Sequence, residues 1–259
     1  TTARGFDAPG ALLLASGLAA LAYGATVLNA DASGFLGIGV RSVAAFVVAA
    51  VLLSAFGVVE KNSPAPIVDP GLIASMQMRT IGVLGLATGL VEASMVFLPT
   101  LAVSALNVVP SRASFMLVPL VLALIAGSVV AGRVLDRTGV RPVIQVGMAL
   151  TVTGLLVFSL APLGRFSFYL AGILVGLGLS SLLGAPLRYA ALEEGGESGR
   201  GASQGLLTVC LSVGRLFGAS VTGGIAAGAA GAVSGYRRSM LVIALAGMLA
   251  LVASRRLRR

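Results

Sequence analysis

The chain has 259 residues, of which 57% are hydrophobic and 10% are charged, and it carries a net charge of +9 and a mean hydropathy of +1.02. Soluble domains have about a quarter of their residues charged, so this composition excludes a soluble domain and predicts an all-α integral membrane protein. The absence of histidine and the single cysteine, Cys210, exclude the usual zinc sites, Ser-His and Cys-His catalytic pairs and an intrachain disulfide.

The basic residues gather at the ends of the apolar runs, with no aromatic residues interleaved among them. This placement indicates the positive-inside rule of membrane proteins and argues against a nucleic-acid partner. No catalytic pair and no metal-binding set can be assembled from the residue types present, so we expect neither an enzyme nor a metal or cofactor.

Eight apolar runs, each close to the roughly 20 residues that span a bilayer, predict eight transmembrane helices. The runs cover residues 11–29, 35–59, 80–107, 114–134, 143–161, 166–190, 201–229 and 239–254. The longest polar and Pro-rich stretch, Glu60 to Pro70, follows the second run. It divides the chain into a two-helix segment (1–59), a cytoplasmic linker (60–79) and a six-helix segment (80–259).

Residues 132–142, with the sequence GRVLDRTGVRP, form a charged turn between the fourth and fifth runs. We expect a tight loop at the membrane surface, in which Gly132 lets backbones approach closely and Gly139 allows a left-handed turn before Pro142 opens the next helix. Asp136 can face the positive end of a neighbouring helix. An ordinary positive-inside loop is the alternative interpretation.

The pattern of this turn, G-x-x-x-D-R-x-G-x-R, resembles the signature loop of the major facilitator transporters, found between the second and third helices of each six-helix half. Pro142 stands where a further basic residue is common. Two spans ending in a Glu, then a Pro-rich segment and six more spans, resemble the fourteen-helix drug:proton antiporters, in which an extra helix pair separates the halves. The resemblance implies that the chain holds the extra pair and the C-terminal half. The N-terminal six helices, in the same or another chain, would be its partner.

The resemblance also implies a fold and a set of functional residues. The last six helices would form two inverted three-helix repeats and rock against the other half to give alternating access. The signature turn would form a cytoplasmic gate from Gly132, Arg133, Asp136, Arg137, Gly139 and Arg141. Glycines that allow close helix packing recur in the fourth and seventh runs, at Gly127, Gly132, Gly214, Gly218, Gly223 and Gly224.

The Lys and Arg residues of the loops predict the orientation. With the signature turn in the cytoplasm, that side collects twelve of them: Arg4, Lys61, Arg79, Arg133, Arg137, Arg141, Arg188, Arg200, Arg255, Arg256, Arg258 and Arg259. The other side collects five: Arg41, Arg112, Arg165, Arg237 and Arg238. This count places both termini in the cytoplasm of a multi-pass protein of the cell (inner or plasma) membrane.

Glu92 lies deep inside the third predicted span, thirteen residues or roughly 20 Å of helix after Arg79. A carboxylate near the bilayer midplane is unfavourable, so we expect Glu92 to be protonated, paired or facing water. Its spacing places Glu92 on one helix face with Met95 and Pro99, and Pro99 can kink the helix. The matching helix of the family lines the central cavity, so the resemblance implies that Glu92 faces substrate.

Arg215 lies roughly 21 Å into the seventh span, also near mid-depth. The segments 201–205 and 214–218 look like the eleventh-helix pattern of major facilitator halves. A guanidinium does not deprotonate, so Arg215 must pair, contact carbonyl groups or line water. If it pairs with Glu92, the carboxylate is held charged, which argues against simple proton carriage, whereas a pair that breaks on arrival of substrate or a proton fits antiport.

The expected function is that of a secondary active transporter, or its C-terminal part, which exports amphipathic or cationic organic compounds in exchange for protons, as in multidrug efflux. Desolvation favours a neutral Glu92 and a cationic ligand favours an ionised one, so one carboxyl could exchange a proton for a drug. Glu193, Glu194 and Glu197 are expected in a solvated cytoplasmic loop, with a gating role as the sharper alternative. The alternative function is a non-transporting membrane scaffold or partner subunit built on a transporter half.

Overall fold

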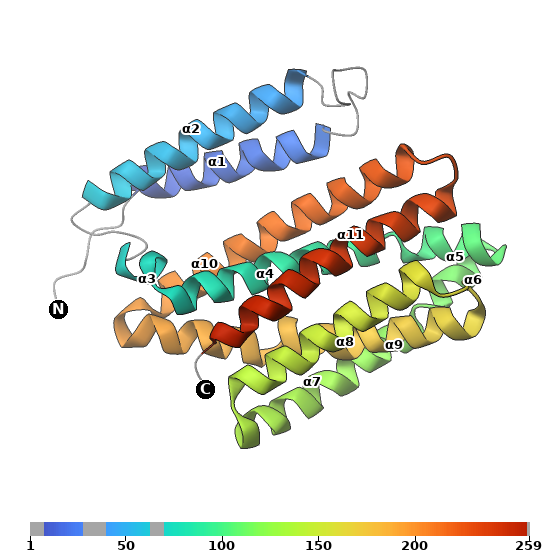
Figure 1. The fold of residues 1–259 in the computed structure, drawn as a ribbon. Coiled ribbons are helices and arrows are strands. Elements are labelled where there is room, and N and C mark those ends of the chain that lie inside the picture. The colour runs from blue at the N-terminus through green and yellow to red at the C-terminus, as the bar shows by residue number, and fades with distance from the viewer. Residues whose placement is uncertain (1–7, 28–39, 63–69, 258–259) are drawn as a thin grey trace.

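The computed structural model describes residues 8–27, 40–62 and 70–257, and every regular element in these residues is helical. The predicted all-α fold is therefore confirmed. In chain order the elements are α1 (Ala8–Val27), α2 (Val40–Asn62), α3 (Pro70–Ala74), α4 (Met76–Met95), α5 (Leu98–Leu106), α6 (Pro110–Phe115), α7 (Val118–Thr138), α8 (Val140–Leu160), α9 (Arg165–Leu183), α10 (Ala185–Ala227), α11 (Ala232–Ala253) and the 3₁₀ turn η2 (Ser254–Arg256). Figure 1 shows α1 and α2 as a hairpin beside a bundle of the later helices.

The helices of the described residues are long and apolar enough for a multi-pass membrane protein. Six stretches could each cross a membrane: Val40–Val59, Pro110–Thr138, Val140–Leu160, Arg165–Glu197, Gly199–Ala227 and Ala232–Arg256. The pair α4 and α5 forms a seventh span that is bent by 46°. The first predicted span corresponds to α1, whose apolar stretch Gly10–Gly24 is shorter than the others. Seven of the eight predicted spans are thus of membrane-crossing length in the described residues.

Two spans contain a break beside a proline. Between Met95 and Leu98 the chain leaves α4 and enters α5, whose second residue is Pro99, the residue predicted to kink this span. Likewise α9 ends at Leu183, and the second residue of α10 is Pro186. The break follows a helix of 20 residues in α4 and of 19 residues in α9. Breaks at matching places agree with two three-helix repeats in which α4 and α9 come first.

The bundle is packed through glycines at two matching helix pairs, α4 with α10 and α7 with α9. A Cβ atom on Gly89 or Gly214 would overlap the facing backbone of the α4–α10 pair, and one on Gly176 would overlap the backbone of Leu120 in the α7–α9 pair. Helices in lipid associate largely through such close van der Waals contact, because burial of apolar area gives little driving force there. In the two repeats, α4 corresponds to α9 and α7 corresponds to the second part of α10. The α4–α10 pair of helices therefore corresponds to the α7–α9 pair.

Three of the glycines predicted to pack closely do so. Gly127 lies against Ser180, Gly214 against the backbone of Leu86, and Gly218 against the backbone of Leu90. The prediction for Gly132 is wrong, because a Cβ atom there would meet nothing within 4 Å among the described residues.

Two apolar clusters fill the bundle, one toward each end. Leu84 of α4 belongs to the first cluster and Val91 of the same helix to the second. The second cluster also holds Phe158 and Phe168, whose rings meet edge to face with centroids 5.4 Å apart. Glu92 therefore lies near the level at which the two clusters meet.

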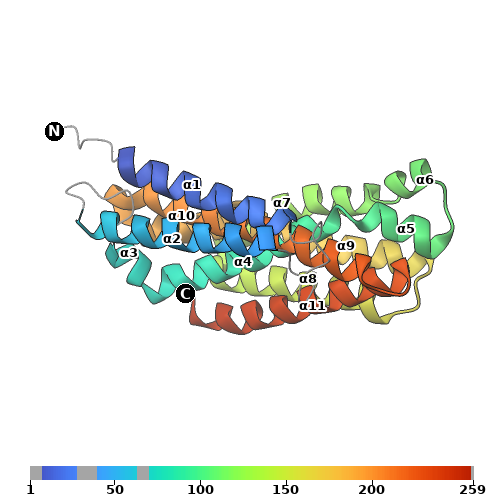
Figure 2. The ribbon, with the colours of Figure 1, turned by 90° about the horizontal axis from the view of Figure 1, so that it is seen from above.

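The α1–α2 hairpin packs on α10, as the views of Figures 1 and 2 agree. Gly24 of α1 lies against Ala45 and Phe46 of α2, which closes the hairpin. Phe46 in turn stacks on Phe217 of α10, with ring centroids 6.4 Å apart and an interplanar angle of 8°. The outward face of α2 is apolar, as lipid contact requires, and exposes Val40, Val43, Val47, Val48, Val51 and Val58.

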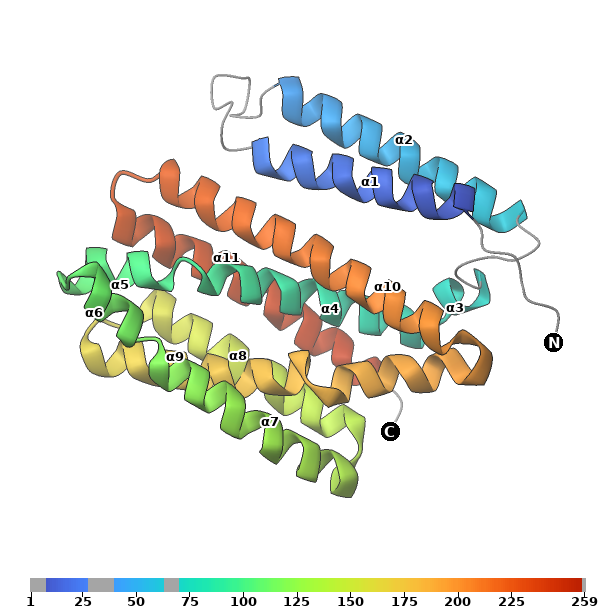
Figure 3. The same cartoon turned by 180° about the vertical axis from the view of Figure 1, so that it is seen from behind.

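The chain reverses within α10 at Gly196, whose φ of 59° and ψ of −168° favour glycine. The first part of α10 completes the span begun by α9, and the second part returns through the bundle (Figure 3). Nε2 of Gln204 donates to the carbonyl oxygen of Arg188 at 2.7 Å and ties the two parts together. The loop predicted around Glu193 and Glu194 is therefore wrong, because the helix continues and one glycine makes the reversal.

The start of α4, the α7–α8 turn, the reversal in α10 and the end of α11 lie at the same end of the bundle (Figures 1 and 3). Helices occupy much of the predicted 60–79 linker, because α2 runs to Asn62, α3 starts at Pro70 and α4 starts at Met76. Residues 63–69 of the linker lie outside the described residues. So do three arginines of the orientation count: Arg4, Arg258 and Arg259.

Candidate functional site

Glu92 on α4 and Arg215 on α10 form an ion pair, the one such pair within the described part of the chain. Nε of Arg215 donates to Oε2 of Glu92 across 2.8 Å. The side chain of Arg215 is 45% exposed and that of Glu92 is 35% exposed. The two charges are therefore paired without being buried, so other groups can reach them.

The two partners lie at the same depth of their spans. Glu92 is about 24 Å of helix from Met76, and Arg215 is about 24 Å of helix from Gly199, at 1.5 Å per residue. An isolated charge at such depth is unfavourable, and pairing lowers this penalty. The pair uses one of the five N–H donors of the guanidinium and one of the two oxygens of the carboxylate. The remaining groups can bind water, a proton or an ionic ligand.

A stripe of polar side chains runs along α10 to the pair. Gln204, Thr208, Ser212 and Arg215 follow one another at helical spacings of four, four and three residues, and each is at least partly exposed. The hydroxyl of Thr208 donates to the carbonyl oxygen of Gln204 at 2.8 Å. Ionisable groups in membrane helices generally face the protein interior or a water-filled cavity. We therefore interpret this face of α10, the polar stripe, as bordering water. The same spacing could have been found in the sequence.

Met95 and Pro99 do not join the pair. Met95 packs against the second apolar cluster. The chain leaves the helix at Val96 and Phe97 before Pro99 begins the next one, so the spacing that would align Pro99 with Glu92 does not hold across the break. Pro99 contributes to the 46° bend between α4 and α5, which follows Glu92 in the chain.

The signature turn is shorter than predicted. α7 continues to Thr138 and α8 begins at Val140, so Gly139 alone forms the turn, with φ 82° and ψ 177°. The positive φ expected at Gly139 is confirmed. A loop that starts at Gly132 is wrong, because the charged residues extend α7 beyond the apolar run instead of ending it.

The charged residues of the turn point outward. Arg133, Asp136 and Arg137 are exposed on the last turns of α7, and Arg141 is half-buried in the first turn of α8. None of them makes an ion pair within residues 70–257. Asp136 lies near the C-terminus of α7, where the helix dipole disfavours a negative charge. Its place therefore does not stabilise the helix.

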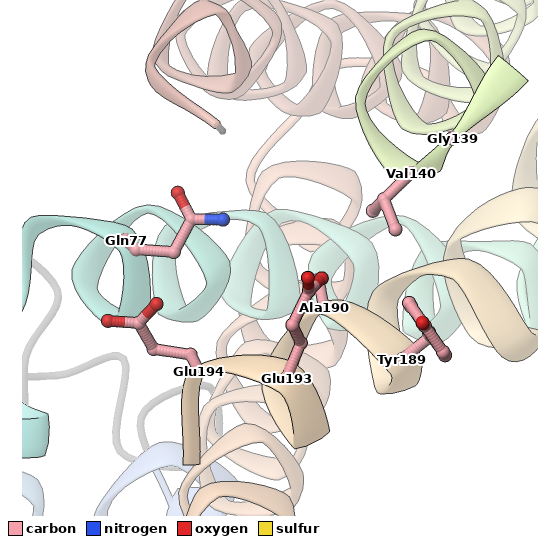
Figure 4. Close-up of a pocket in the computed structure, with 7 residues that line it drawn as sticks. All are labelled: Gln77, Gly139, Val140, Tyr189, Ala190, Glu193 and Glu194. Carbon is pink, nitrogen blue, oxygen red and sulfur yellow. The ribbon is translucent and has the colours of Figure 1, made fainter. Parts of the chain in front are cut away.

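A cavity of roughly 310 Å³ lies beside this turn (Figure 4). Its lining combines the turn with α4 and the first part of α10: Gln77, Gly139, Val140, Tyr189, Ala190, Glu193 and Glu194. Ser75 caps α4 by accepting from the backbone N–H of Met78, and its hydroxyl donates to Oε1 of Glu194. Glu194 therefore links the start of α4 to α10. The sequence could not reveal this cavity, because its lining joins residues of α4, the α7–α8 turn and α10 that are far apart along the chain.

The described residues offer no metal-binding group. Within residues 8–27, 40–62 and 70–257, no three His, Cys, Asp or Glu side chains lie together so that they could hold a metal ion. The chemistry of the site is therefore that of one carboxylate, one guanidinium and the polar stripe.

The amino-acid sequence of the chain is similar to that of a bacterial membrane transporter. It is 28% identical over 219 residues to YfiU of Bacillus subtilis (strain 168), an uncharacterized MFS-type transporter. The aligned region covers 82% of this chain and 42% of that protein, so the chain spans less than half of the relative's length. No family model matches the chain. This similarity supports the resemblance to the major facilitator superfamily (MFS) that the signature turn indicated. It does not indicate any particular branch of that superfamily.

Proposed function

We propose that the chain is the C-terminal part of a secondary active transporter of the major facilitator superfamily, of its fourteen-helix branch, and exports amphipathic or cationic organic compounds in exchange for protons. The observation that carries this proposal is the exposed Glu92–Arg215 pair at mid-span, to which the polar stripe leads. In this assignment α1 and α2 are the extra helix pair, and the helices from α4 to α11 are the second half.

Coupling follows from competition for one carboxylate. Arg215 neutralises Glu92 in the described state, at 2.8 Å. A proton on Glu92 removes the negative charge and releases the guanidinium, and a cationic substrate displaces the guanidinium by pairing with the carboxylate itself. The carboxylate binds either a proton or a cation. Binding of a cationic substrate therefore releases the proton, and binding of a proton releases the substrate.

The surface beside the pair suits an amphipathic cation. Val96, one helical turn after Glu92, is 75% exposed, and Ala219, one turn after Arg215, is also exposed. An apolar body would lie against these aliphatic groups while a positive group reached the carboxylate. Uncharged or anionic compounds would leave Glu92 without a competing cation.

The opposite wall of the pathway would come from the N-terminal six helices, in the same or another chain. Arg133, Asp136 and Arg137 are exposed at the end of the bundle where this half would close, and we assign them and Gly139 to the cytoplasmic gate. The larger count of basic residues at this end supports cytoplasmic termini in the cell membrane.

Transport by the complete protein in proteoliposomes tests the proposal. A proton gradient is imposed, and the movement of a lipophilic cation such as tetraphenylphosphonium is followed. Glu92→Gln keeps the size of the side chain and removes its charge, so proton-driven transport should fall by roughly a hundredfold, the scale of a lost acid–base group. Glu197→Gln is the matched control, because Glu197 is exposed beside the reversal in α10 and lies far from the pair along the helix.

Equal transport by the wild type and Glu92→Gln would remove Glu92 from the mechanism. Absence of transport by the complete wild-type protein, for a panel of cations, would instead favour the non-transporting scaffold.

A further inference from the structure

A second cavity lies between α4 and α10, away from the polar stripe. It encloses roughly 300 Å³ and is lined by Met78, Arg79, Gly82, Val83, Leu86, Leu206 and Cys210. Arg79 is the one charged residue in this lining, and the other side chains are aliphatic or contain sulfur. We call this cavity the apolar groove.

The apolar groove opens on a different face of α10 from the Glu92–Arg215 pair. Leu206, Cys210 and Phe217 recur at spacings of four and seven residues and share one face of the helix. Arg215 stands two residues before Phe217, which turns it roughly 200° away. The groove thus lies on the face of α10 that also carries Phe217, and not on the face that carries Arg215 and the polar stripe.

Charge is concentrated at one end of the apolar groove. Arg79 lies in the first turn of α4, and Leu86 lies about 10 Å deeper along the helix. Nη1 of Arg256 lies 3.9 Å from Sδ of Met76, which neighbours Arg79 at a spacing of three residues on the surface of α4. Arg79 therefore lines the charged end of the groove, Arg256 contacts α4 about one helical turn before it, and the rest of the lining is apolar.

We propose that the apolar groove binds one anionic phospholipid of the cytoplasmic leaflet, with its phosphate at Arg79 and Arg256 and a segment of one acyl chain against Val83, Leu86 and Leu206. Charge complementarity selects this occupant. Basic pockets between membrane helices suit anionic head groups, whereas a zwitterionic lipid offers the same chain without the net charge. Along α4, the charged residue lies near the membrane surface and the aliphatic residues lie deeper. A lipid in one leaflet has the same order, with its head group at the surface and its acyl chains below.

The leaflet assignment rests on the proposed orientation of the chain, and the lipid site does not depend on transport. Loss of tetraphenylphosphonium transport in the experiment above would therefore leave this inference standing.

Cys210 reports on the apolar groove, because it lines the cavity, is partly exposed and is the one cysteine of the chain. The purified complete protein in detergent is titrated with phosphatidylglycerol or phosphatidylcholine, and alkylation of the Cys210 peptide by N-ethylmaleimide is followed by mass spectrometry. We expect phosphatidylglycerol to protect Cys210 at a concentration more than about fivefold lower than phosphatidylcholine, since each arginine near anionic lipid contributes a factor of about five.

The double variant Arg79→Gln and Arg256→Gln should bring the two protection midpoints together, and Arg256→Gln alone should shift the phosphatidylglycerol midpoint about halfway. The matched control, Arg188→Gln with Arg200→Gln, makes the same charge change at the same end of the bundle and should keep the preference. Size-exclusion profiles establish that each variant is folded. Equal midpoints in the wild type, absence of protection by either lipid, or an unchanged preference in the double variant would each overturn the proposal.

Discussion

The α4–α10 and α7–α9 pairs are packed alike and differ in the groups they expose. Glycine brings backbones into contact in both, at Gly89 and Gly214 in the first pair and at Gly176 in the second. The first pair carries Glu92 and Arg215 at mid-span. Over its middle, α7 instead exposes aliphatic residues: Val121, Leu122, Ile125, Val129 and Val130.

This difference separates the scaffold from the function. Close glycine packing recurs in both helix pairs, so it serves the architecture of the bundle. The charged pair occurs in one of the two helix pairs of the described structure, so it is not required by that architecture. A substitution in the charged pair should affect transport, and a substitution at a packing glycine should affect stability first.

The largest effect is expected for Arg215→Gln. Glu92 would remain at mid-span without its cation, and we expect transport to fall by roughly a hundredfold. Arg215→Lys keeps the charge but loses the planar fork, so about a tenfold loss is expected. Ser128→Ala on α7, where the hydroxyl bonds to the carbonyl oxygen of Ile125, is the matched change on the other pair and should have no effect. If Arg215→Gln transported at the wild-type rate, the proposed functional difference between the α4–α10 and α7–α9 pairs would be contradicted.

Gly214→Ala and Gly176→Ala should each lower the free energy of unfolding by about 1–3 kcal/mol, because the added methyl group would overlap a facing backbone. Thermal unfolding in detergent measures this loss. Transport per folded molecule should fall for Gly214→Ala, which displaces the neighbour of Arg215, and should persist for Gly176→Ala. An equal loss of specific transport in both variants would show that the two pairs are not functionally different.

At the signature turn, Gly139→Ala should destabilise the protein by about 1–2 kcal/mol, because φ of 82° is unfavourable for alanine. Gly132→Ala is the control in the same segment. Its Cβ atom would meet nothing within 4 Å among the described residues, and alanine favours a helix. We therefore expect no loss of stability for Gly132→Ala, and equal unfolding midpoints for the two variants would be inconsistent with the observed turn.

In the described residues, the contact between the α1–α2 hairpin and α10 has no counterpart on the α7–α9 pair. Of the contacts considered, it should contribute least to the free energy of unfolding. Phe46→Ala removes the stacked ring of Phe46 on Phe217, and we expect a loss of less than about 1 kcal/mol in the thermal assay. Val47→Ala changes an exposed residue of the same helix and should have no effect. A loss of several kcal/mol for Phe46→Ala would mean that the hairpin is integral to the bundle.

Hydropathy predicted the spans and the depth of the charges, and it could not predict which faces meet. Glu92 and Arg215 are 123 positions apart, and whether they touch depends on the rotation of α4 and α10 about their axes. Glycine packing decides this rotation. The sequence left pairing as one of three alternatives for each residue, and the structure shows the pair and its partial exposure.

Turns were predicted less well than spans, because charged residues mark the membrane boundary and not the end of a helix. α7 continues through Arg133 and Asp136 to Thr138, and the whole turn is made by Gly139. Likewise, α10 continues through Glu193 and Glu194, where a loop was expected, and the chain reverses at Gly196. Positive φ at single glycines is a local property that hydropathy does not reveal.

A double-mutant cycle on transport tests the central claim, that Glu92 and Arg215 act as one unit. Proton-driven transport is measured for Glu92→Gln, Arg215→Gln and the combined variant in the complete protein. We predict that the combined variant loses no more than the worse single variant, because groups that act together show strongly non-additive effects. Losses that multiply across the two substitutions would contradict the account.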